Sequence, residues 1–303
     1  MDPIEVKSLR KSYGAVEAVR GVTFSVAKGS IYGLIGPDGA GKTTIMRSIV
    51  SLLSIDGGEL RFMGRLVDAE PGFVRSHIGY MPQRFSLYQD LSVEENLRFF
   101  GDLFAVPHRE LAERISRLYE FSGLEPFKAR RAAALSGGMK QKLALSCMLV
   151  HAPEVIVLDE PTFGVDPVSR NEFWTILRSL AAEGTTILVS TAYMDEALLC
   201  DRVALVYRGQ LLANDLPAAL IAAYTGQLWL ARTESPHRVY DVLQPSTLCG
   251  ECNLFGEGVH LTLAPGIAAD DLEDFLSERG VDLQEFHPVE ASLEDLFLKL
   301  MKD

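Results

Sequence analysis

The fold of this 303-residue sequence is decided by the stretch Gly36-Pro37-Asp38-Gly39-Ala40-Gly41-Lys42-Thr43. It has the spacing G-x-x-x-x-G-K-[ST] and follows a short apolar run at 30–35 that predicts a strand. The glycines let successive backbone N–H groups converge on phosphate oxygens, and the N-terminus of the helix expected next adds a partial positive charge. Lys42 is expected to reach the β- and γ-phosphates of a nucleotide, and Thr43 to bind Mg²⁺. The plain structural alternative is a glycine turn that opens a helix, with a chance lysine.

A second stretch, Val155–Glu160, consists of four apolar residues followed by two carboxylates. Continuous apolar runs suit parallel strands that are buried on both faces. We expect Asp159 to hold Mg²⁺ through water and Glu160 to orient or deprotonate an attacking water. Such a run is a weak signal alone, because any strand that ends in a charged turn shows it. Together with the phosphate loop it predicts a nucleotide hydrolase.

Strands and helices alternate through residues 1–217, which indicates an α/β layer architecture. Strands are predicted from apolar alternation or apolar runs, and helices from longer periodic segments. A capping box, Ser92-x-x-Glu95, opens one of the helices. The expected segments are strands at 4–6, 22–26, 30–35, 155–158 and 186–190, and helices at 93–103 and 109–122.

The net charge of −12 is concentrated at one end of the chain. Residues 218–303 hold 15 acidic and 5 basic residues, whereas the rest of the sequence holds 26 and 24. This shift, together with the break that Pro217 imposes on regular structure, predicts a domain boundary near 216–217. We therefore expect a cassette at 1–217 and an acidic accessory domain at 218–303. The single phosphate loop predicts one nucleotide cassette in the chain.

The composition argues against several classes of protein. A hydrophobic content of 48% and a charged content of 23% are typical of a globular protein. The negative charge argues against a coat for nucleic acid, which needs a basic surface. No apolar run reaches the roughly 20 residues that span a bilayer, and residues 1–14 lack the apolar core of a signal peptide. Four cysteines do not make a disulfide framework, so we expect a cytoplasmic protein.

A third motif, Leu135-Ser136-Gly137-Gly138-Met139, precedes an apolar helical pattern at 143–149. Ser136 fits a helix N-cap, and local physics does not choose between a helix cap and a second anion site. The order and spacing of this motif, the phosphate loop, Gln83 and the acidic pair agree with those of a known family. Over about residues 1–217 the sequence resembles the ATP-binding subunit of an ABC transporter. The run Met81-Pro82-Gln83-Arg84 and the C-terminal extension resemble drug and antibiotic exporters.

The resemblance implies a phosphate-loop NTPase cassette with an α/β fold. It has a mostly parallel core sheet, an N-terminal antiparallel β subdomain and a helical subdomain at about 90–153 that carries the signature motif. A small α/β domain follows at 218–303. The implied cofactors are ATP and Mg²⁺. The implied partners are a second cassette, which meets the first head to tail around two ATP molecules, and a transmembrane permease on a separate chain. No nucleic-acid partner is expected, and the place of action is the inner face of the cell membrane.

The resemblance also assigns roles to single residues. Glu160, Lys42 and Gln83 are the catalytic residues, and Thr43, Gln83 and Asp159 are the metal site. Tyr13 stacks on adenine, although an ordinary tyrosine at a strand end is the alternative. Ser136, Gly137 and Gly138 touch the γ-phosphate of ATP that the opposite subunit holds, and the loop 163–166 lines that interface. The residues expected to bind the cofactor are Tyr13, Gly36, Pro37, Asp38, Gly39, Ala40, Gly41, Lys42, Thr43, Thr44, Gln83, Asp159, Ser136, Gly137 and Gly138.

The sequence departs from the family pattern at Ala192. The family usually has a histidine there, after the strand at 186–190 and before x-x-Asp-Glu-Ala. Alanine can neither hydrogen-bond a γ-phosphate nor orient Glu160. Losing one such polar contact costs on the order of 10²-fold in rate. We therefore expect slow hydrolysis, or hydrolysis that depends on another cassette or a membrane partner.

The segment after Gln83 is rich in large apolar residues, which are Phe85, Leu87, Tyr88, Leu91, Leu97, Phe99 and Phe100. Core packing of a helical subdomain is the first interpretation. The resemblance implies a second, that this segment is the docking surface for a cytoplasmic helix of the permease.

The accessory domain is long enough for a small α/β unit. We expect strands at 227–231 and 258–263, a helix at 270–279 and a final helix at 289–298 with Ser292 as its cap. Its acidic surface is either simply solvated or a dimer-stabilising or regulatory contact. Cys249 and Cys252 form a C-x-x-C pair, which we expect to be plain thiols in a loop. Zinc would need four ligands, with His260 and His287 at unsuitable spacing, and a redox pair is the third alternative.

Two other functions stay open at this point. One is an ABC protein without a permease that acts on ribosomes or DNA, which the single cassette, the absence of a basic arm and the acidic charge disfavour. The other is a nucleotide sensor that binds ATP without turnover, which Ala192 favours.

Overall fold

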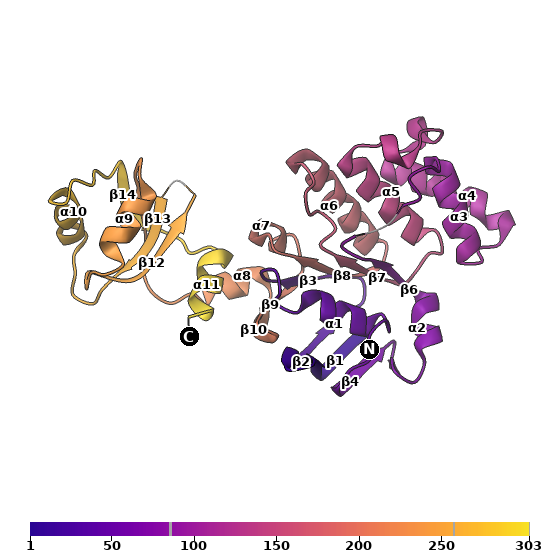
Figure 1. Cartoon of the computed structure of the whole chain (residues 1–303), viewed down its shortest axis with the longest axis horizontal. Coiled ribbons are helices and arrows are strands. Elements are labelled where there is room, and N and C mark those ends of the chain that lie inside the picture. Colours follow the sequence, from indigo (N-terminus) through magenta and orange to yellow (C-terminus); the bar gives the residue numbers. More distant parts are fainter. Residues whose placement is uncertain (85–86, 257, 303) are drawn as a thin grey trace. The chain divides into compact units, whose positions relative to one another are not determined.

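The computed structural model describes residues 1–84, 87–256 and 258–302 (Figure 1). Phe85, one of the apolar residues of the expected docking segment, lies outside this description. The chain divides into two compact units, Met1–Pro217 and Ala218–Asp303, and each is described by itself. Within the described ranges, none of the helices has the length and apolar character to cross a bilayer.

An antiparallel sheet forms the N-terminal part of the first unit. It consists of β1 (Ile4–Tyr13), β2 (Val16–Val26), β4 (Gly57–Phe62) and β5 (Arg65–Leu66), in the order β2-β1-β4-β5. The strands at 4–6 and 22–26 are confirmed, but both are much longer than predicted. Register irregularities between β1 and β2 break the apolar alternation after Val6, which explains the short prediction.

The core sheet of this unit has the strand order β10-β9-β3-β8-β7-β6. Its strands β6, β7, β8, β3 and β9 pair in parallel, and β10 joins β9 antiparallel at the edge. Every residue of β3, β7 and β8 is buried, as expected for apolar runs covered on both faces. The predicted α/β fold is confirmed. The strands are β3 (Ile31–Ile35), β6 (Ile78–Met81), β7 (Val155–Asp159), β8 (Thr186–Thr191), β9 (Arg202–Tyr207) and β10 (Gln210–Asp215).

Helix α1 (Lys42–Ile49) lies between the two sheets (Figure 1), and its residues Ile45, Met46 and Ile49 belong to a core shared with strands of both. On the other side of the core sheet lie the helices that include the signature motif. The remaining helices of the unit are α2 (Pro71–His77), whose Phe73 and Val74 pack in the same core as α1, and α3 (Val93–Leu103), α4 (His108–Ser122), α5 (Gly137–Leu149), α6 (Pro167–Ala182) and α7 (Met194–Ala197), with short 3-10 turns at Glu125–Phe127 and Ala132–Ala134.

The helix ends follow the signals in the sequence. The capping box of α3 forms as predicted, because the Glu95 N–H donates to Ser92 Oγ and the Ser92 N–H donates to Glu95 Oε2. Helix α4 begins one residue earlier than predicted, directly after Pro107. Helix α5 begins after Ser136, whose hydroxyl accepts from the Met139 N–H at 3.3 Å.

The second unit is an antiparallel sheet with helices on it. The sheet order is β12-β13-β11-β14, and α9 and α10 contribute Val239, Leu243, Leu272 and Leu276 to its core. The elements are α8 (Pro217–Ala222), β11 (Leu228–Arg232), α9 (Pro236–Leu243), β12 (Cys249–Phe255), β13 (Gly258–Leu263), α10 (Ala269–Ser277), β14 (Glu285–Val289) and α11 (Leu293–Leu300).

Two expectations for this unit were wrong. The final helix does not begin at Val289, which ends strand β14; it begins after Ser292, the predicted cap. The C-x-x-C pair is not in a loop, because Cys249 and Cys252 lie on strand β12. Neither β12 nor β14 shows a clean alternation, since β12 contains a register irregularity and β14 contains a proline on an edge strand.

Candidate functional site

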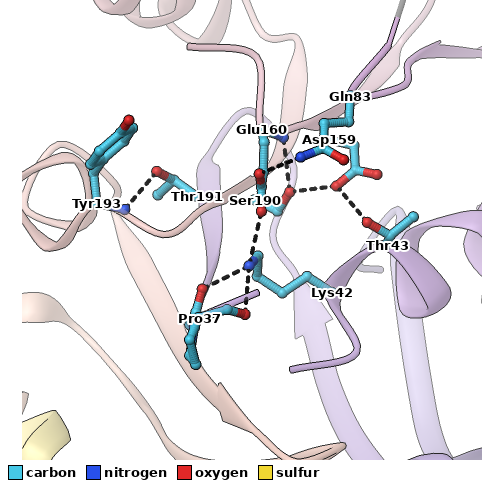
Figure 2. Close-up of polar contacts among 10 residues, drawn as sticks. Pro37, Lys42, Thr43, Gln83, Asp159, Glu160, Ser190, Thr191 and Tyr193 are labelled. Carbon is cyan, nitrogen blue, oxygen red and sulfur yellow. Dashed lines mark hydrogen bonds and ion pairs between the residues drawn. The ribbon is translucent and has the colours of Figure 1, made fainter. Parts of the chain in front are cut away.

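The candidate site lies where four parallel strands of the core sheet end. Strand β3 leads into the loop 36–41, β6 leads to Gln83, β7 ends at Asp159, and β8 ends at Thr191. Carboxyl ends of parallel strands meet at one edge of a sheet, which is where open α/β sheets bind ligands. The sheet topology therefore gathers the phosphate loop, Gln83 and the acidic pair, which are far apart in the sequence (Figure 2).

The phosphate loop depends on glycine at two positions. A Cβ on Gly36 would lie 2.1 Å from the Val206 carbonyl oxygen, so only glycine allows the loop to leave β3 against β9. Gly41, the N-cap of α1, has φ 108° and would place a Cβ 2.6 Å from the Ala18 carbonyl oxygen. The loop therefore packs backbone against backbone, with α1 starting at Lys42.

Lys42 points back into the loop and is buried, with 4% of its surface exposed. Its ammonium donates to the carbonyl oxygens of Gly36 at 2.7 Å and Pro37 at 3.0 Å. It also forms an ion pair with Glu160 Oε1 at 3.0 Å. A buried ammonium needs such partners, because the loss of hydration would otherwise expel it. The positive charge is thus fixed at the mouth of the loop.

Asp159 is held by two hydroxyls through one oxygen. Thr43 Oγ1 donates to Asp159 Oδ1 at 3.1 Å, and Ser190 Oγ donates to the same oxygen at 2.8 Å. The other oxygen, Oδ2, is buried and has no hydrogen-bond partner among the described residues. Burial raises the pKa of Asp159 more than the hydrogen bonds from Ser190 and Thr43 lower it.

This donor set fits a magnesium ion. Mg²⁺ prefers hard oxygen ligands and keeps several of its waters, so one or two protein groups are enough. An unpartnered buried carboxylate oxygen beside a threonine hydroxyl provides such groups. Gln83, the third residue expected at the metal, lies on the Glu160 side of the cluster, where its Nε2 donates to Glu160 Oε2 at 2.8 Å.

Glu160 combines an unusual backbone with a fully engaged side chain. Its φ of 50° is in the left-handed region, which costs about 1 kcal/mol or more for a residue other than glycine. Its carboxylate contacts Lys42 through Oε1 and Gln83 through Oε2, and only 7% of the residue is exposed. The turn after β7 therefore aims the carboxylate at the phosphate loop.

Ser190 is a site residue that sequence reasoning missed. It is fully buried and pairs with Asp159 in the register of β7 and β8. Its hydroxyl donates to Asp159 Oδ1 and accepts from the Glu160 N–H at 3.0 Å, so one side chain holds both members of the acidic pair. The signal was a polar residue at the end of an apolar run, but its importance depends on strand register, which the sequence does not show.

The segment at residue 192 leaves the site. Ala192 is exposed, and the Tyr193 N–H donates to Thr191 Oγ1 at 3.0 Å. The Tyr193 ring is directed away from Glu160 (Figure 2) and lies under the Arg170 guanidinium, 4.8 Å from it. In the described residues, Tyr193 therefore does not replace the expected histidine.

Other predicted residues stand apart from this cluster. Tyr13 ends β1 and is 49% exposed. Ser136 caps α5, and Gly138 packs against Ser169, where a Cβ would lie 2.4 Å from the serine hydroxyl. Among the described residues the signature motif shares no hydrogen bond with the acidic pair. In the loop itself Asp38 and Gly39 are exposed, Pro37, Gly41, Thr43 and Thr44 are half-buried, and Gly36 and Ala40 are buried.

Comparison with known proteins decides the family. Residues 19–163 match the family model of the ABC transporter. The "Nod factor export ATP-binding protein I" of Paraburkholderia xenovorans (strain LB400) is 38% identical over 98% of this chain and 96% of its own length. This chain is an ABC transporter ATP-binding subunit. The predicted family is thus confirmed.

A second relative of the ATP-binding subunit is "Probable multidrug ABC transporter ATP-binding protein YbhF" of Escherichia coli (strain K12). It is 45% identical over 219 residues, which cover 72% of this chain but only 38% of the relative. The chain thus spans well under half the length of that relative.

Solved structures share the fold of the ATP-binding subunit. The ADP conformation of MJ1267, "an ATP-binding cassette of an ABC transporter", superposes with a TM-score of 0.66 at 28% identity, over 71% of this chain and 91% of the other. The "dimeric structure of MJ0796, a bacterial ABC transporter cassette" gives 0.63 at 26% identity, over 70% and 98%.

Proposed function

We propose that this ATP-binding subunit binds Mg·ATP at residues 36–44 and hydrolyses ATP to power export through a permease on a separate chain. The observation that carries the proposal is the cluster of Lys42, Thr43, Asp159 and Glu160 at one sheet edge. A fixed positive charge, a free carboxylate oxygen for a cation and a second carboxylate are the parts that phosphoryl transfer to water requires. MJ1267, which has a related fold, is described in an ADP conformation.

In this proposal Thr43, Asp159 and Gln83 hold Mg²⁺, which neutralises charge on the phosphates when it is bound. Lys42 exchanges its contacts with Glu160 and the Gly36 and Pro37 carbonyls for phosphate oxygens. Glu160 is then free of its ion pair and orients or deprotonates the attacking water. The hydrogen bond from Gln83 keeps the Glu160 carboxylate in place during this exchange.

The second half of the proposed site comes from another cassette. Ser136 and Gly137 are exposed at the N-terminus of α5, and Phe163 in the loop 163–166 is 59% exposed. An exposed helix N-terminus of this kind suits a phosphate of a neighbouring molecule. The dimeric MJ0796 structure supports such an arrangement, and a chain with one phosphate loop requires it. Tyr13, exposed at the end of β1, is proposed to stack on the adenine.

The helical part of the unit presents an apolar surface for the permease. Tyr88 is 48% exposed and its ring packs against the Phe99 ring in a tilted arrangement, with the ring centroids 4.4 Å apart, whereas Leu87 and Leu97 are buried in the core. Beneath them Asn96 is fully buried, and its side-chain amide bonds the backbone of residues 88–92. The aromatic surface is therefore on a rigid base. We propose that it contacts the permease at the inner face of the cell membrane.

The exported compound is proposed from relatives alone. The two relatives are described as acting in multidrug and Nod factor export, so a drug-like or lipid-like compound is the proposed cargo. The contacts with this compound are expected in the permease.

Ala192 favours slow turnover in the isolated subunit. The test is phosphate release from Mg·ATP by the wild-type chain beside Glu160→Gln and Ala192→His. Turnover that Glu160→Gln abolishes supports the hydrolase, and an increase with Ala192→His identifies the missing imidazole as the limit. ATP binding without phosphate release in the wild type and both variants would instead support a nucleotide sensor. Absence of ATP binding would overturn both functions.

A further inference from the structure

The accessory unit contains two thiols whose placement the ATPase function does not use. Cys249 and Cys252 are both half-buried on strand β12, and both pack against the core of the unit. In a regular strand, residues three apart point to opposite faces of the sheet. An ordinary strand would therefore keep these two side chains apart.

An irregularity in β12 removes this separation. Cys249 pairs with Leu263 and Cys252 pairs with Leu261, so three steps along β12 match two steps along β13. Such a bulge inserts one extra residue into the strand, so that the side chain three positions further along lies on the same face as the first. Leu261 and Leu263 are two apart on β13 and share its core face, and residues directly opposite each other share a face as well. Both thiols therefore lie on the core face of the sheet.

The bulge also sets the separation of the two backbones. Two strand steps correspond to roughly 7 Å, which is near the upper end of the Cα separations that disulfides bridge. The Cys249 thiol donates to the Leu243 carbonyl oxygen at 3.3 Å, which holds it on this face of the sheet. Interaction between the two neighbouring side chains lowers the pKa of Cys249 and raises the pKa of Cys252, so Cys249 is the thiol expected to lose its proton and attack first.

A metal site is not supported by the surrounding residues. Within the described residues no group of three or more His, Cys, Asp or Glu side chains could hold a metal ion. His260, on the neighbouring strand, is instead bonded through Nδ1 to Asp295 Oδ1 at 2.9 Å. The other two cysteines, Cys147 and Cys200, are buried in the first unit, where burial raises their pKa values.

We propose that Cys249 and Cys252 form a reversible dithiol–disulfide site that exchanges with small-molecule disulfides such as oxidised glutathione. The Cys249 thiolate attacks one sulfur of glutathione disulfide, the S–S bond breaks, and one glutathione leaves as a thiol. Cys252 then attacks the sulfur of Cys249 and releases the second glutathione. The two protons of the protein thiols end on the two glutathiones, and the protein gives up two electrons.

A disulfide between Cys249 and Cys252 would constrain one wall of a cavity. Gly250 and Glu251, the two residues between the thiols, line a cavity of about 510 Å³ together with Trp229, Thr262 and Lys299. The Glu251 N–H donates to Thr262 Oγ1 at 2.8 Å, which fixes the bulge to β13. Oxidation would lock the backbone of this wall segment.

The full chain, reduced and freed of reductant, provides the test. It is incubated with glutathione disulfide, unfolded, alkylated and digested with trypsin. Both thiols fall in one tryptic peptide, 239–279, which contains no other cysteine. We expect this peptide to lose two hydrogens and to escape alkylation, while the peptides with Cys147 and Cys200 are alkylated. Cys252→Ser should trap a single glutathione on Cys249.

Two results would overturn the proposal. One is a peptide 239–279 that stays reduced under conditions that oxidise a free dithiol. The other is a peptide with two separate glutathiones, because it would show that the thiols do not reach each other. As a control, the chain unfolded in urea should form the disulfide more slowly than the folded chain, since only the fold provides the bulge.

Discussion

Replacing Ser190 by alanine tests whether one buried hydroxyl controls the acidic pair. The variant removes a hydrogen bond of 2.8 Å to Asp159 Oδ1 and one of 3.0 Å from the Glu160 N–H. Each carboxylate region keeps a second contact, because Thr43 still donates to Asp159 and the Glu160 N–H still reaches the Ser190 carbonyl oxygen at 3.2 Å. We therefore expect Asp159 and Glu160 to become less precisely positioned while the protein stays folded.

The magnitude follows from the two bonds. A hydrogen bond to a charged group contributes about 1.5–3 kcal/mol, and a neutral one about 1 kcal/mol. We expect Ser190→Ala to lower the free energy of unfolding by about 2 kcal/mol. Because a rate changes tenfold for each 1.4 kcal/mol, we expect kcat to fall about 10- to 100-fold as Glu160 and Asp159 lose alignment.

The assay separates positioning from simple destabilisation. Phosphate release is measured against ATP and against Mg²⁺, well below the unfolding temperature of each variant. We expect a lower kcat and a higher Mg²⁺ requirement with little change in the KM for ATP, since Ser190 contacts no loop residue among its described partners. Ser190→Thr, which keeps the hydroxyl, should recover most of the rate. A Ser190→Ala enzyme with kcat and Mg²⁺ requirement within twofold of the wild type would refute the reasoning.

Three other substitutions give distinct expected outcomes. Lys42→Ala removes the cation beside buried Glu160, so we expect ATP affinity to fall at least about tenfold and the free energy of unfolding to fall by about 3 kcal/mol. Equilibrium ATP binding measures the first effect and urea unfolding the second. Lys28→Ala, at an exposed position, is the control that should change neither. Asp159→Asn keeps an oxygen acceptor but no charge. The pKa of Asp159 is raised by burial, so its ionisation costs stability as pH rises above the ordinary value of 3.8. Without Mg²⁺ we thus expect Asp159→Asn to be more stable than the wild type at pH 7, with a difference that shrinks as pH falls toward 3.8; a difference independent of pH would contradict the cause. Asn96→Ala should lower the free energy of unfolding by about 2 kcal/mol or more, because it leaves backbone groups of residues 88–92 without their buried partner; an unchanged urea midpoint would show that water replaces the amide.

The acidic pair illustrates how far local patterns reach. The apolar run 155–158 identified a strand buried on both faces, and the two carboxylates after it were recognisable as site residues beside the phosphate loop. The same logic could not rank Ser190, because every buried strand that ends in a polar residue offers the same signal. Only the parallel register of β7 and β8 places Ser190 beside Asp159.

The accessory unit shows where alternation fails. Strand β13 was predicted from its clean apolar pattern, and the Ser292 cap marked the start of α11. Strand β12 was not predicted, because its bulge shifts the side chains and breaks the period of two. The C-x-x-C pair suggested a loop, but the bulge places both thiols on one face of strand β12.

The sequence by itself determined the phosphate loop, the buried strands, the helix caps and the boundary in charge near 217, since each depends on residues close together in the chain. The tertiary structure alone decided which oxygen of Asp159 has no hydrogen-bond partner among the described residues, that Lys42 is paired with Glu160, and that the Ser190 hydroxyl contacts both the Asp159 carboxylate and the Glu160 N–H. These features depend on strand order and register, and thus on packing between segments more than one hundred residues apart in the case of Lys42 and Glu160. Local propensity carries no information on such pairings, because they follow from the free energy of the whole core.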